Sequence, residues 1–405
     1  ESEDTPEWMS NRAYPLIVYT DGEEVKHKIV PRNNSQMLVN IAFLEDEAIT
    51  EKLAELLSGG GCAGVIVNSV RRAQELARKL TDNFGGDVVR LLHSRILTPD
   101  RITKEEILMK ELGKPGAGRI RPDRRIVVGT QVLEQSLDID FDLLITDICP
   151  MDLLLQRIGR LHRHDRQRPP RLQNALCFVT GVRESEFDSA STSIYGKYLL
   201  MRTKARLPNQ LQLPGDIPEL VQDVYDAHCP LVPETEDYLK TKAEYNLLLE
   251  HQRRRADAFR MNAPRTMADM VGWLNTDVSD KNGEASVRDT EDSIEVLLIR
   301  STVSGRIAFL PWIEQGMELD PNREPPAEIA RKLACCSVRL PVAVCGRFKA
   351  LDATIQRLEQ INKEQLSAWQ QSPWLRGELF LILDEHLSAE IGKHRVTYHP
   401  EYGLD

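Results

Sequence analysis

Hydrophobic and polar positions form regular blocks along the first 180 residues, and these blocks predict strands and helices in turn. An apolar run covers 63–68, and apolar positions at helical spacing follow it as far as Phe84. Further strands are predicted at 88–92, 126–128, 143–147 and 175–180, with a helical segment near 103–112. Because strands and helices alternate, the pattern indicates an α/β fold built on a parallel sheet.

The pattern changes character after residue 180. Residues 207–218 are rich in proline and polar side chains, 239–261 have a helical pattern, and 276–292 are acidic. We therefore expect 183–290 to be a linker that contains a long helix. Beyond it, the pattern predicts a smaller α+β domain with strands at 295–300, 306–310 and 378–383 and a helix at 350–371.

Polar side chains follow the predicted strand 126–128. Thr130, Gln131, Glu134 and Asp138 all lie in the segment between this strand and the next. Ligand sites in parallel α/β sheets lie at the carboxyl ends of the strands. These four side chains are therefore candidate ligand contacts.

A run of arginines follows the strand 143–147. Gln156, Arg157, Gly159, Arg160 and Arg163 form the pattern Q-R-x-G-R-x-x-R. On a continuous helix, residues three apart are displaced by about 60°, so the three arginines would share one side and could bind one phosphate. A glycine inside a helix costs roughly 1 kcal/mol, which is tolerable where a backbone or a nucleotide must approach closely. A solvated basic helix is the simpler alternative, and the polar segment before it argues against that alternative.

These segments together resemble a known family. Residues 127–163 resemble motifs V and VI of superfamily 2 helicases, and their wording, TQVLEQSLDIDFD and QRIGRLHRH, is similar to that of the CRISPR-associated helicase-nucleases of type I interference systems. Residues 64–69 (GVIVNS) are similar to motif IV of the family, and 92–95 (LHSR) to the short motif after the next strand. Residues 398–404 (YHPEYGL) are similar to its closing sequence.

The resemblance implies a domain organisation. Residues 1–182 would be the second RecA-like helicase domain, 183–290 the linker, and 291–405 the C-terminal domain. ATP with Mg²⁺ would bind in the cleft between this domain and a first RecA-like domain that the sequence does not contain. Single-stranded DNA would be translocated in the 3′-to-5′ direction after recruitment by a crRNA-guided surveillance complex, and phage-encoded inhibitor proteins are a further class of partner.

The resemblance also implies roles for residues. Arg160 and Arg163 would be arginine fingers, and Gln156 would contact the nucleotide or the attacking water. Arg157 and Gly159 would belong to the ATP site, and Asp138 would bind the ribose or couple to motif VI. The expected nucleic-acid contacts are Thr130, Gln131, Glu134, Ser69 and His93.

Several motifs of a complete enzyme are missing from the sequence. There is no G-x-x-x-x-G-K-[ST] phosphate loop and no His-Asp nuclease cluster, so we expect no metal site. Residues 379–386 (LFLILDEH) imitate a magnesium-binding motif II, but they follow the arginine run instead of preceding it and lack the D-E-x-H spacing. His164 and Asp165 form a lone pair to which we assign a structural role. We therefore expect this chain alone not to hydrolyse ATP.

The composition of the chain bears on where the protein acts and how it would bind DNA. The chain has 405 residues, a net charge of −10 and seven cysteines without C-x-x-C spacing. Free thiols and the lack of a long apolar run predict a soluble, cytoplasmic protein with no membrane segment. The negative charge predicts that any DNA binding is local, and the basic runs 119–125 and 253–255 are more simply solvated surface than DNA contacts.

Three hypotheses follow from the sequence. The first is the motor half of a CRISPR helicase-nuclease. The second is another superfamily 2 helicase, because motifs V and VI do not distinguish DNA from RNA. The third is a non-catalytic interaction fragment that binds a partner or an inhibitor.

Overall fold

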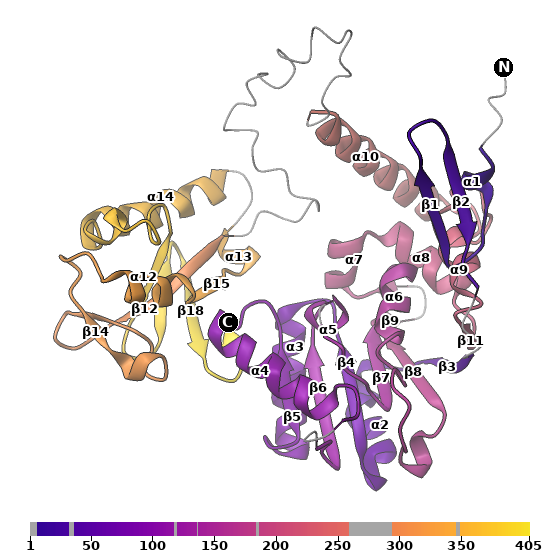
Figure 1. Ribbon diagram of the computed structural model, residues 1–405, viewed down its shortest axis with the longest axis horizontal. Helices are drawn as coiled ribbons and strands as arrows, with labels where there is room; N and C mark the ends of the chain where they lie inside the picture. Colours follow the sequence, from indigo (N-terminus) through magenta and orange to yellow (C-terminus); the bar gives the residue numbers. More distant parts are fainter. Residues whose placement is uncertain are drawn as a thin grey trace, which may run out of the picture.

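A seven-stranded sheet organises the amino-terminal part of the molecule (Figure 1). The computed structural model describes residues 6–31, 36–116, 120–135, 137–183, 186–258, 294–345 and 349–405. The strand order is β11-β3-β8-β7-β4-β6-β5, and all neighbours pair in parallel except β11, which is antiparallel to β3. The strands are β3 Met37–Phe43, β4 Gly61–Ile66, β5 Val89–Leu92, β6 Arg124–Gly129, β7 Leu143–Asp147, β8 Ala175–Thr180 and β11 Gln210–Leu213. The predicted parallel α/β sheet is thus confirmed.

Helices cover both faces of this sheet, and each face has its own hydrophobic core. The helices are α2 Ile49–Leu56, α3 Val70–Phe84, α4 Thr98–Leu112, α5 Val132–Gln135, α6 Met151–Ile158, α7 Ser189–Tyr195, α8 Lys197–Arg206 and α9 Ile217–Tyr225. Side chains of α2 and α3 share a core with Ile126 and Val128, whereas α4, α5, α6, α8 and α9 share the other with Val127. Because alternate residues of β6 face opposite cores, the strand is apolar from Ile126 to Val128.

The sheet extends into the segment predicted as a linker. Strand β11 pairs with β3, and Leu200, Leu220 and Val224 pack in the core that contains the sheet. The sheet therefore does not end at residue 182, although the division of the chain into domains stays a prediction. The long helix is confirmed as α10 Glu236–Ala258, and the acidic segment 276–292 lies outside the described residues.

Some shorter elements were not predicted. Helix α1 (Glu7–Ser10) precedes an antiparallel hairpin of β1 Leu16–Thr20 and β2 Val25–Ile29. A second small hairpin joins β9 Val182–Arg183 to β10 Glu186–Phe187. These strands are short or largely exposed, so they lack the buried apolar run that marks the strands of the central sheet.

The carboxyl-terminal part has a separate hydrophobic core between a mixed sheet and its helices. Strand β12 lies inside that sheet, antiparallel to β13 and β15 and parallel to β16. Its strands are β12 Glu295–Ser301, β13 Ile307–Ala308, β14 Glu318–Leu319, β15 Ser337–Arg339 and β16 Phe380–Leu383, and its helices are α12 Ala327–Ala334, α13 Val342–Cys345 and α14 Lys349–Gln365. A three-stranded sheet of β17 Ser388–Ile391, β18 His394–His399 and β19 Gly403–Leu404 ends the chain. The predicted smaller α+β unit is present.

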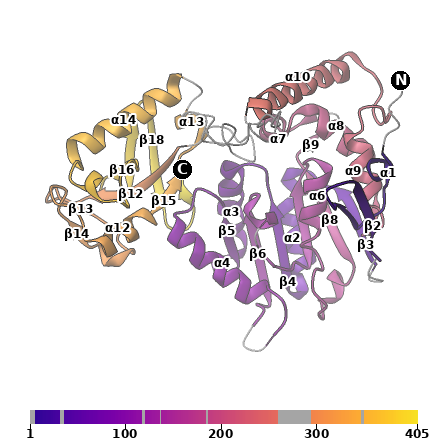
Figure 2. The same cartoon turned by 45° about the horizontal axis from the view of Figure 1, so that its top comes forward.

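The end of the chain docks on the connection between β5 and α4, beside which both views place the C-terminus (Figures 1 and 2). The Leu404 amide donates to the Arg95 carbonyl at 2.8 Å, and the Leu97 amide donates to the Tyr398 hydroxyl at 3.0 Å. Gly403 has φ 72°, and a Cβ there would lie 2.5 Å from the Arg95 oxygen. Only glycine suits so close an approach in this conformation.

Candidate nucleotide and nucleic-acid site

The arginine run does not form one continuous helix. Helix α6 ends at Ile158 with Gly159 as its C-cap at φ −62°, and His162 takes a left-handed φ of 47°. Beyond the helix, the backbone of Leu161 forms an isolated parallel β-bridge with Phe141. The prediction that three arginines share one helix side is therefore wrong. Gly159 is a helix end, and its missing Cβ would meet oxygens of its own helix, with Gln156 O at 3.2 Å.

Arg157 points into the protein instead of toward a ligand. Its side chain is fully buried, and its Nε lies 2.7 Å from a carboxylate oxygen of Glu134, which is buried too. The other guanidinium nitrogens donate to Thr146 Oγ1 at 2.9 Å and Asn68 Oδ1 at 2.9 Å. Each side chain is thus the buried ion-pair partner of the other, and the roles of Arg157 as an ATP contact and of Glu134 as a nucleic-acid contact stay predictions.

Arg160 and Arg163 are the arginines of this run that remain partly open. Arg160 donates to two backbone oxygens, Glu134 O at 2.7 Å and Leu133 O at 3.4 Å, and the described residues provide no carboxylate within ion-pair distance. Arg163 Nε lies 2.5 Å from Asp138 Oδ1, with both side chains about two-fifths exposed. Asp138 therefore contacts motif VI directly, and its role toward a ribose stays a prediction.

The charges around Arg160 favour an added anion. Burial and the neighbouring Arg163 charge both lower the pKa of Arg160. The hydrogen bond from Arg163 lowers the pKa of Asp138, so that carboxylate is ionised and offsets one of the two positive charges. One positive charge is left without a carboxylate among the described residues. A phosphate oxygen placed between the two guanidinium groups would satisfy it.

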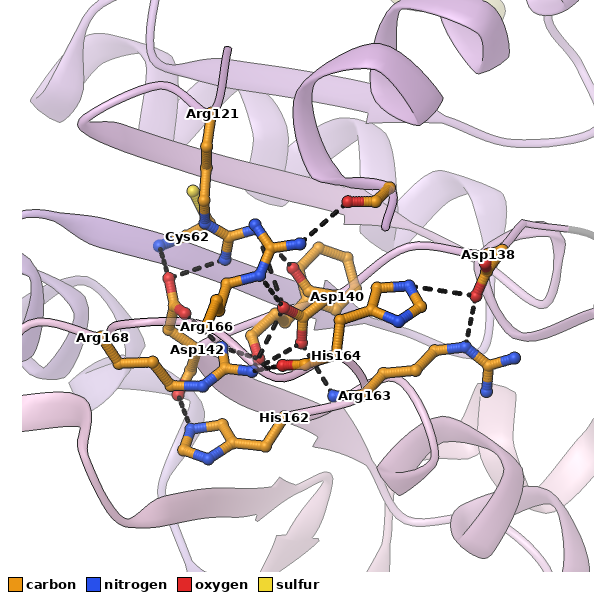
Figure 3. A network of polar contacts seen from close by, with 12 residues as sticks. Cys62, Arg121, Asp138, Asp140, Asp142, His162, Arg163, His164, Arg166 and Arg168 are labelled. Atoms are coloured by element: carbon orange, nitrogen blue, oxygen red, sulfur yellow. Dashed lines mark hydrogen bonds and ion pairs between the residues drawn. The ribbon is translucent and has the colours of Figure 1, made fainter. Parts of the chain in front are cut away.

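A buried group that we call the aspartate cluster anchors the chain after α6 (Figure 3). Asp140 and Asp142 have side chains with no exposed surface. Arg166 Nε lies 2.6 Å from Asp140, Arg121 Nη2 lies 2.7 Å from Asp142, and Arg168 pairs with both aspartates. Although burial raises the pKa of Asp142, the charge and hydrogen bond of Arg121, the Cys62 amide and the Arg168 charge together hold that pKa below its usual range. The cluster fixes the backbone that positions Arg160 and Arg163.

The same contacts concern the basic run 119–125, which is called the second basic run, the run 253–255 being the third. Arg121 is held by Asp142 and Arg125 by Glu111, at 2.7 Å and 2.5 Å, and both arginines are largely buried. These two arginines are therefore not solvated surface. Arg119 lies outside the described residues. In the third run, the Arg254 side chain is 80% exposed on α10, as expected of solvated surface.

The predicted nucleic-acid contacts separate into two groups. Ser69 caps α3 by accepting from the Arg72 amide at 3.3 Å, and Gln131 Nε2 reaches the Asn68 carbonyl at 3.4 Å. These two residues follow neighbouring parallel strands at one edge of the sheet. Thr130 stands beside Gln131, but only 2% of its surface is exposed. Gln156 is exposed on α6.

His93 is buried in this structure, and its role as a nucleic-acid contact stays a prediction. It has no exposed surface, and its Nε2 lies 3.0 Å from the Tyr402 carbonyl under the docked end of the chain. Burial lowers its pKa to about 3, so the ring is neutral. The sequence pattern placed His93 correctly at a strand end but could not reveal that Tyr402, 309 residues later, covers it.

Two polar residues were missed by the sequence reasoning. Asn68 accepts from Arg157 and lies directly before Ser69, so its place at a strand end was an available signal. Tyr195 accepts from Gln131 Nε2 at 3.0 Å and from Arg157 Nη2 at 3.3 Å. Nothing in the sequence around Tyr195 indicated this position.

Two further expectations concern metals and membranes. Asp384, in the segment that imitates motif II, accepts from the His386 and Ser388 amides and so forms a turn. Within the described ranges, no three His, Cys, Asp or Glu side chains are grouped to hold a metal ion, and the cysteines are free thiols. None of the described helices is long and apolar enough to cross a membrane.

Comparison with known proteins agrees with the motifs. Residues 59–166 match the family described as CRISPR-associated nuclease/helicase Cas3, C-terminal, and residues 288–404 match the Cas3 C-terminal domain. A CRISPR-associated nuclease/helicase Cas3 of Streptococcus thermophilus is 39% identical over 97% of this chain and 43% of its own length. The Thermus thermophilus relative is 29% identical over 96% of this chain and 47% of its own length.

Solved structures have the same architecture. The ATP complex of T. fusca Cas3 aligns with a TM-score of 0.82 at 26% identity, over all of this chain and 47% of that one. A chain of a CRISPR RNA-guided surveillance complex, pre-nicking, has a TM-score of 0.76 at 24% identity, over all of this chain and 50% of that one, and shows the fold alone. The fold and the two matched segments place the chain among the carboxyl-terminal parts of CRISPR-associated nuclease/helicases.

The chain belongs to the CRISPR-associated nuclease/helicase Cas3 family and corresponds to its carboxyl-terminal half. It spans less than half the length of the curated relatives that it matches.

Proposed function

We propose that this chain supplies the arginine-bearing wall of an ATP site in a single-stranded-DNA translocase coupled to a nuclease. The observation that supports this is Arg160, a half-buried guanidinium next to Arg163 whose described contacts are two backbone oxygens. ATP bound with Mg²⁺ by the first RecA-like domain would supply the transferable phosphoryl group. Arg160 and Arg163 would stabilise the charge that develops on it, and exposed Gln156 would contact the nucleotide or the attacking water.

The DNA contacts that we propose lie at the carboxyl edge of β4 and β6. Ser69 at the start of α3, together with Gln131 and Thr130, offers hydroxyl and amide groups, which grip phosphates without reading sequence. Gln131 and Arg157 both donate hydrogen bonds to the Tyr195 hydroxyl. The proposed DNA contacts and the helix that precedes Arg160 are therefore joined by polar side chains.

The partners that we propose follow from the family. Recruitment by a crRNA-guided surveillance complex is proposed because both matched families are CRISPR-associated Cas3 families. We expect the protein to act on invader DNA in the cytoplasm, and phage-encoded inhibitors are a further class of partner.

The test joins this chain to the amino-terminal half that its relatives carry, and we call the product the joined protein. The joined protein should hydrolyse ATP faster with single-stranded DNA, whereas the chain alone should not exceed background. Arg163→Ala should abolish the hydrolysis without changing the melting temperature. A matched control is Arg183→Ala, because Arg183 forms an exposed ion pair with Glu47 away from the site. Unchanged turnover in Arg163→Ala would remove Arg163 from the mechanism.

The same assay tests the other hypotheses. Stimulation by RNA in place of DNA would favour an RNA-directed helicase. Absence of any hydrolysis by a folded joined protein would favour the non-catalytic interaction fragment.

A further inference from the structure

Helix α7 brings two hydroxyl groups to the place where the strand-end segments and α6 meet. Ser191 is fully buried, and its Oγ accepts from Asn68 Nδ2 at 2.6 Å. One helical turn later, Tyr195 accepts from Gln131 and Arg157. Asp188 caps the helix by accepting from the Ser191 amide at 2.9 Å. The short helix is thereby held in a fixed register against the site.

The Tyr195 hydroxyl oxygen accepts hydrogen bonds from two side chains, Gln131 and Arg157, for which different roles are proposed. Gln131 lies at the edge proposed for DNA, whereas Arg157 belongs to α6, at whose end Arg160 begins the open arginine pair. Burial raises the pKa of Tyr195 to about 12, so the phenol stays neutral. A neutral phenol oxygen that accepts from both donors makes the position of each depend on the other.

Asn68 closes the connection on its other side. Its side chain accepts from Arg157 Nη2 at 2.9 Å and donates to Ser191 and to the Ile148 carbonyl. Ile148 lies in the turn between β7 and α6, two residues before the proline that begins the helix. A movement at Ser69 or Gln131 would therefore reach α6 through Asn68 and Tyr195, because each of these side chains is hydrogen-bonded to Arg157.

We infer that Tyr195 is a positioning residue, which transmits the state of the DNA edge at Gln131 to the arginines of the nucleotide wall. The inference rests on the proposed function and goes beyond it, because it assigns the coupling to a side chain outside the helicase motifs. Tyr195 itself touches neither ligand. Its loss should change how strongly DNA stimulates hydrolysis more than it changes hydrolysis without DNA.

The experiment compares Tyr195→Phe and Tyr225→Phe in the joined protein. Tyr225 is the matched control, because its hydroxyl donates to Asp152 on α6 at 2.6 Å without contacting Gln131 or Arg157. We expect Tyr195→Phe to lower the DNA stimulation of ATP hydrolysis by about three- to tenfold while basal hydrolysis stays within twofold. Tyr225→Phe should keep the full stimulation. Melting temperatures of both variants report any common structural cost.

A double-mutant cycle with Gln131→Ala completes the test. If Tyr195 acts through Gln131, the double variant should lose no more stimulation than Gln131→Ala alone. Ser191→Ala should lower stimulation in the same direction if Tyr195→Phe proves too unstable to measure. Full stimulation in Tyr195→Phe, or an equal loss in Tyr225→Phe, would overturn the inference. A wild-type joined protein that DNA does not stimulate would instead overturn the proposed function.

Discussion

The motif residues divide into an inward region and an outward region that the sequence does not distinguish. Arg157, Arg166 and Arg168 face inward and pair with buried carboxylates, whereas Arg160 and Arg163 of the same run face outward. Buried charges are tolerated only when paired, and the partners of the inward arginines lie 23 to 28 residues earlier. The difference teaches that Arg157, Arg166 and Arg168 support the fold, and that Arg160 and Arg163 stay partly exposed, as the proposed phosphate contact requires.

The largest predicted effect concerns the outward region. Arg160→Ala in the joined protein should lower the turnover number of DNA-stimulated hydrolysis by about 10³- to 10⁵-fold, because a positive charge at the transferred phosphoryl group is lost. The melting temperature should stay unchanged, since the side chain contacts only backbone oxygens among the described residues. Steady-state assays with thermal denaturation measure both. Wild-type turnover in this variant would erase the distinction between the two regions.

The inward region should respond through stability. Asp142→Asn leaves Arg121 and Arg168 without their buried partner charge and should lower the free energy of unfolding by about 3–5 kcal/mol. Urea denaturation of this chain measures the loss. Asp138→Asn is the control, because its ion pair is exposed and surface pairs contribute about 1 kcal/mol or less. Equal losses in the two variants would contradict the assignment.

His93 extends the comparison to pH. Its pKa is lowered by burial from 6.5 to about 3, so folding favours the neutral ring. The stability that this provides is complete above pH 6.5 and is lost as pH falls from 6.5 toward 3. At pH 5 the loss should be about 2 kcal/mol. Urea midpoints between pH 8 and 5 should fall less in His93→Gln, which cannot titrate, and parallel curves would show that His93 is not the titrating group.

The smallest effect concerns the docked end of the chain. Tyr398 donates to Asp100 Oδ2 at 2.9 Å and accepts from the Leu97 amide. Tyr398→Phe should cost about 1 kcal/mol, because one buried amide loses its acceptor. Hydrogen exchange at the Leu97 amide should rise about fivefold. An unchanged exchange rate would mean that this contact does not hold the carboxyl-terminal part in place.

The elements with buried apolar runs could be predicted from the sequence. The structure has β7 at 143–147 and β8 at 175–180, as predicted, because both strands are apolar on two covered faces. Strand β11 was missed because its four residues alternate polar and apolar at the edge of the sheet. Within the site, the prediction that the arginines share one side of a helix was wrong, because α6 ends at Ile158 and Arg160 and Arg163 lie beyond it. The aspartates that draw the later arginines inward are distant in sequence.

The roles proposed for Arg160 and Arg163 require that their positive charges interact with the transferred phosphoryl group. The most direct measurement is the affinity of the joined protein for ADP with aluminium fluoride, which imitates the transferred group, compared with its affinity for ADP alone. Arg160→Ala should weaken binding of the aluminium fluoride complex by about 10³-fold and leave ADP binding nearly unchanged. Equal affinities of the wild type and Arg160→Ala for the complex would contradict the account.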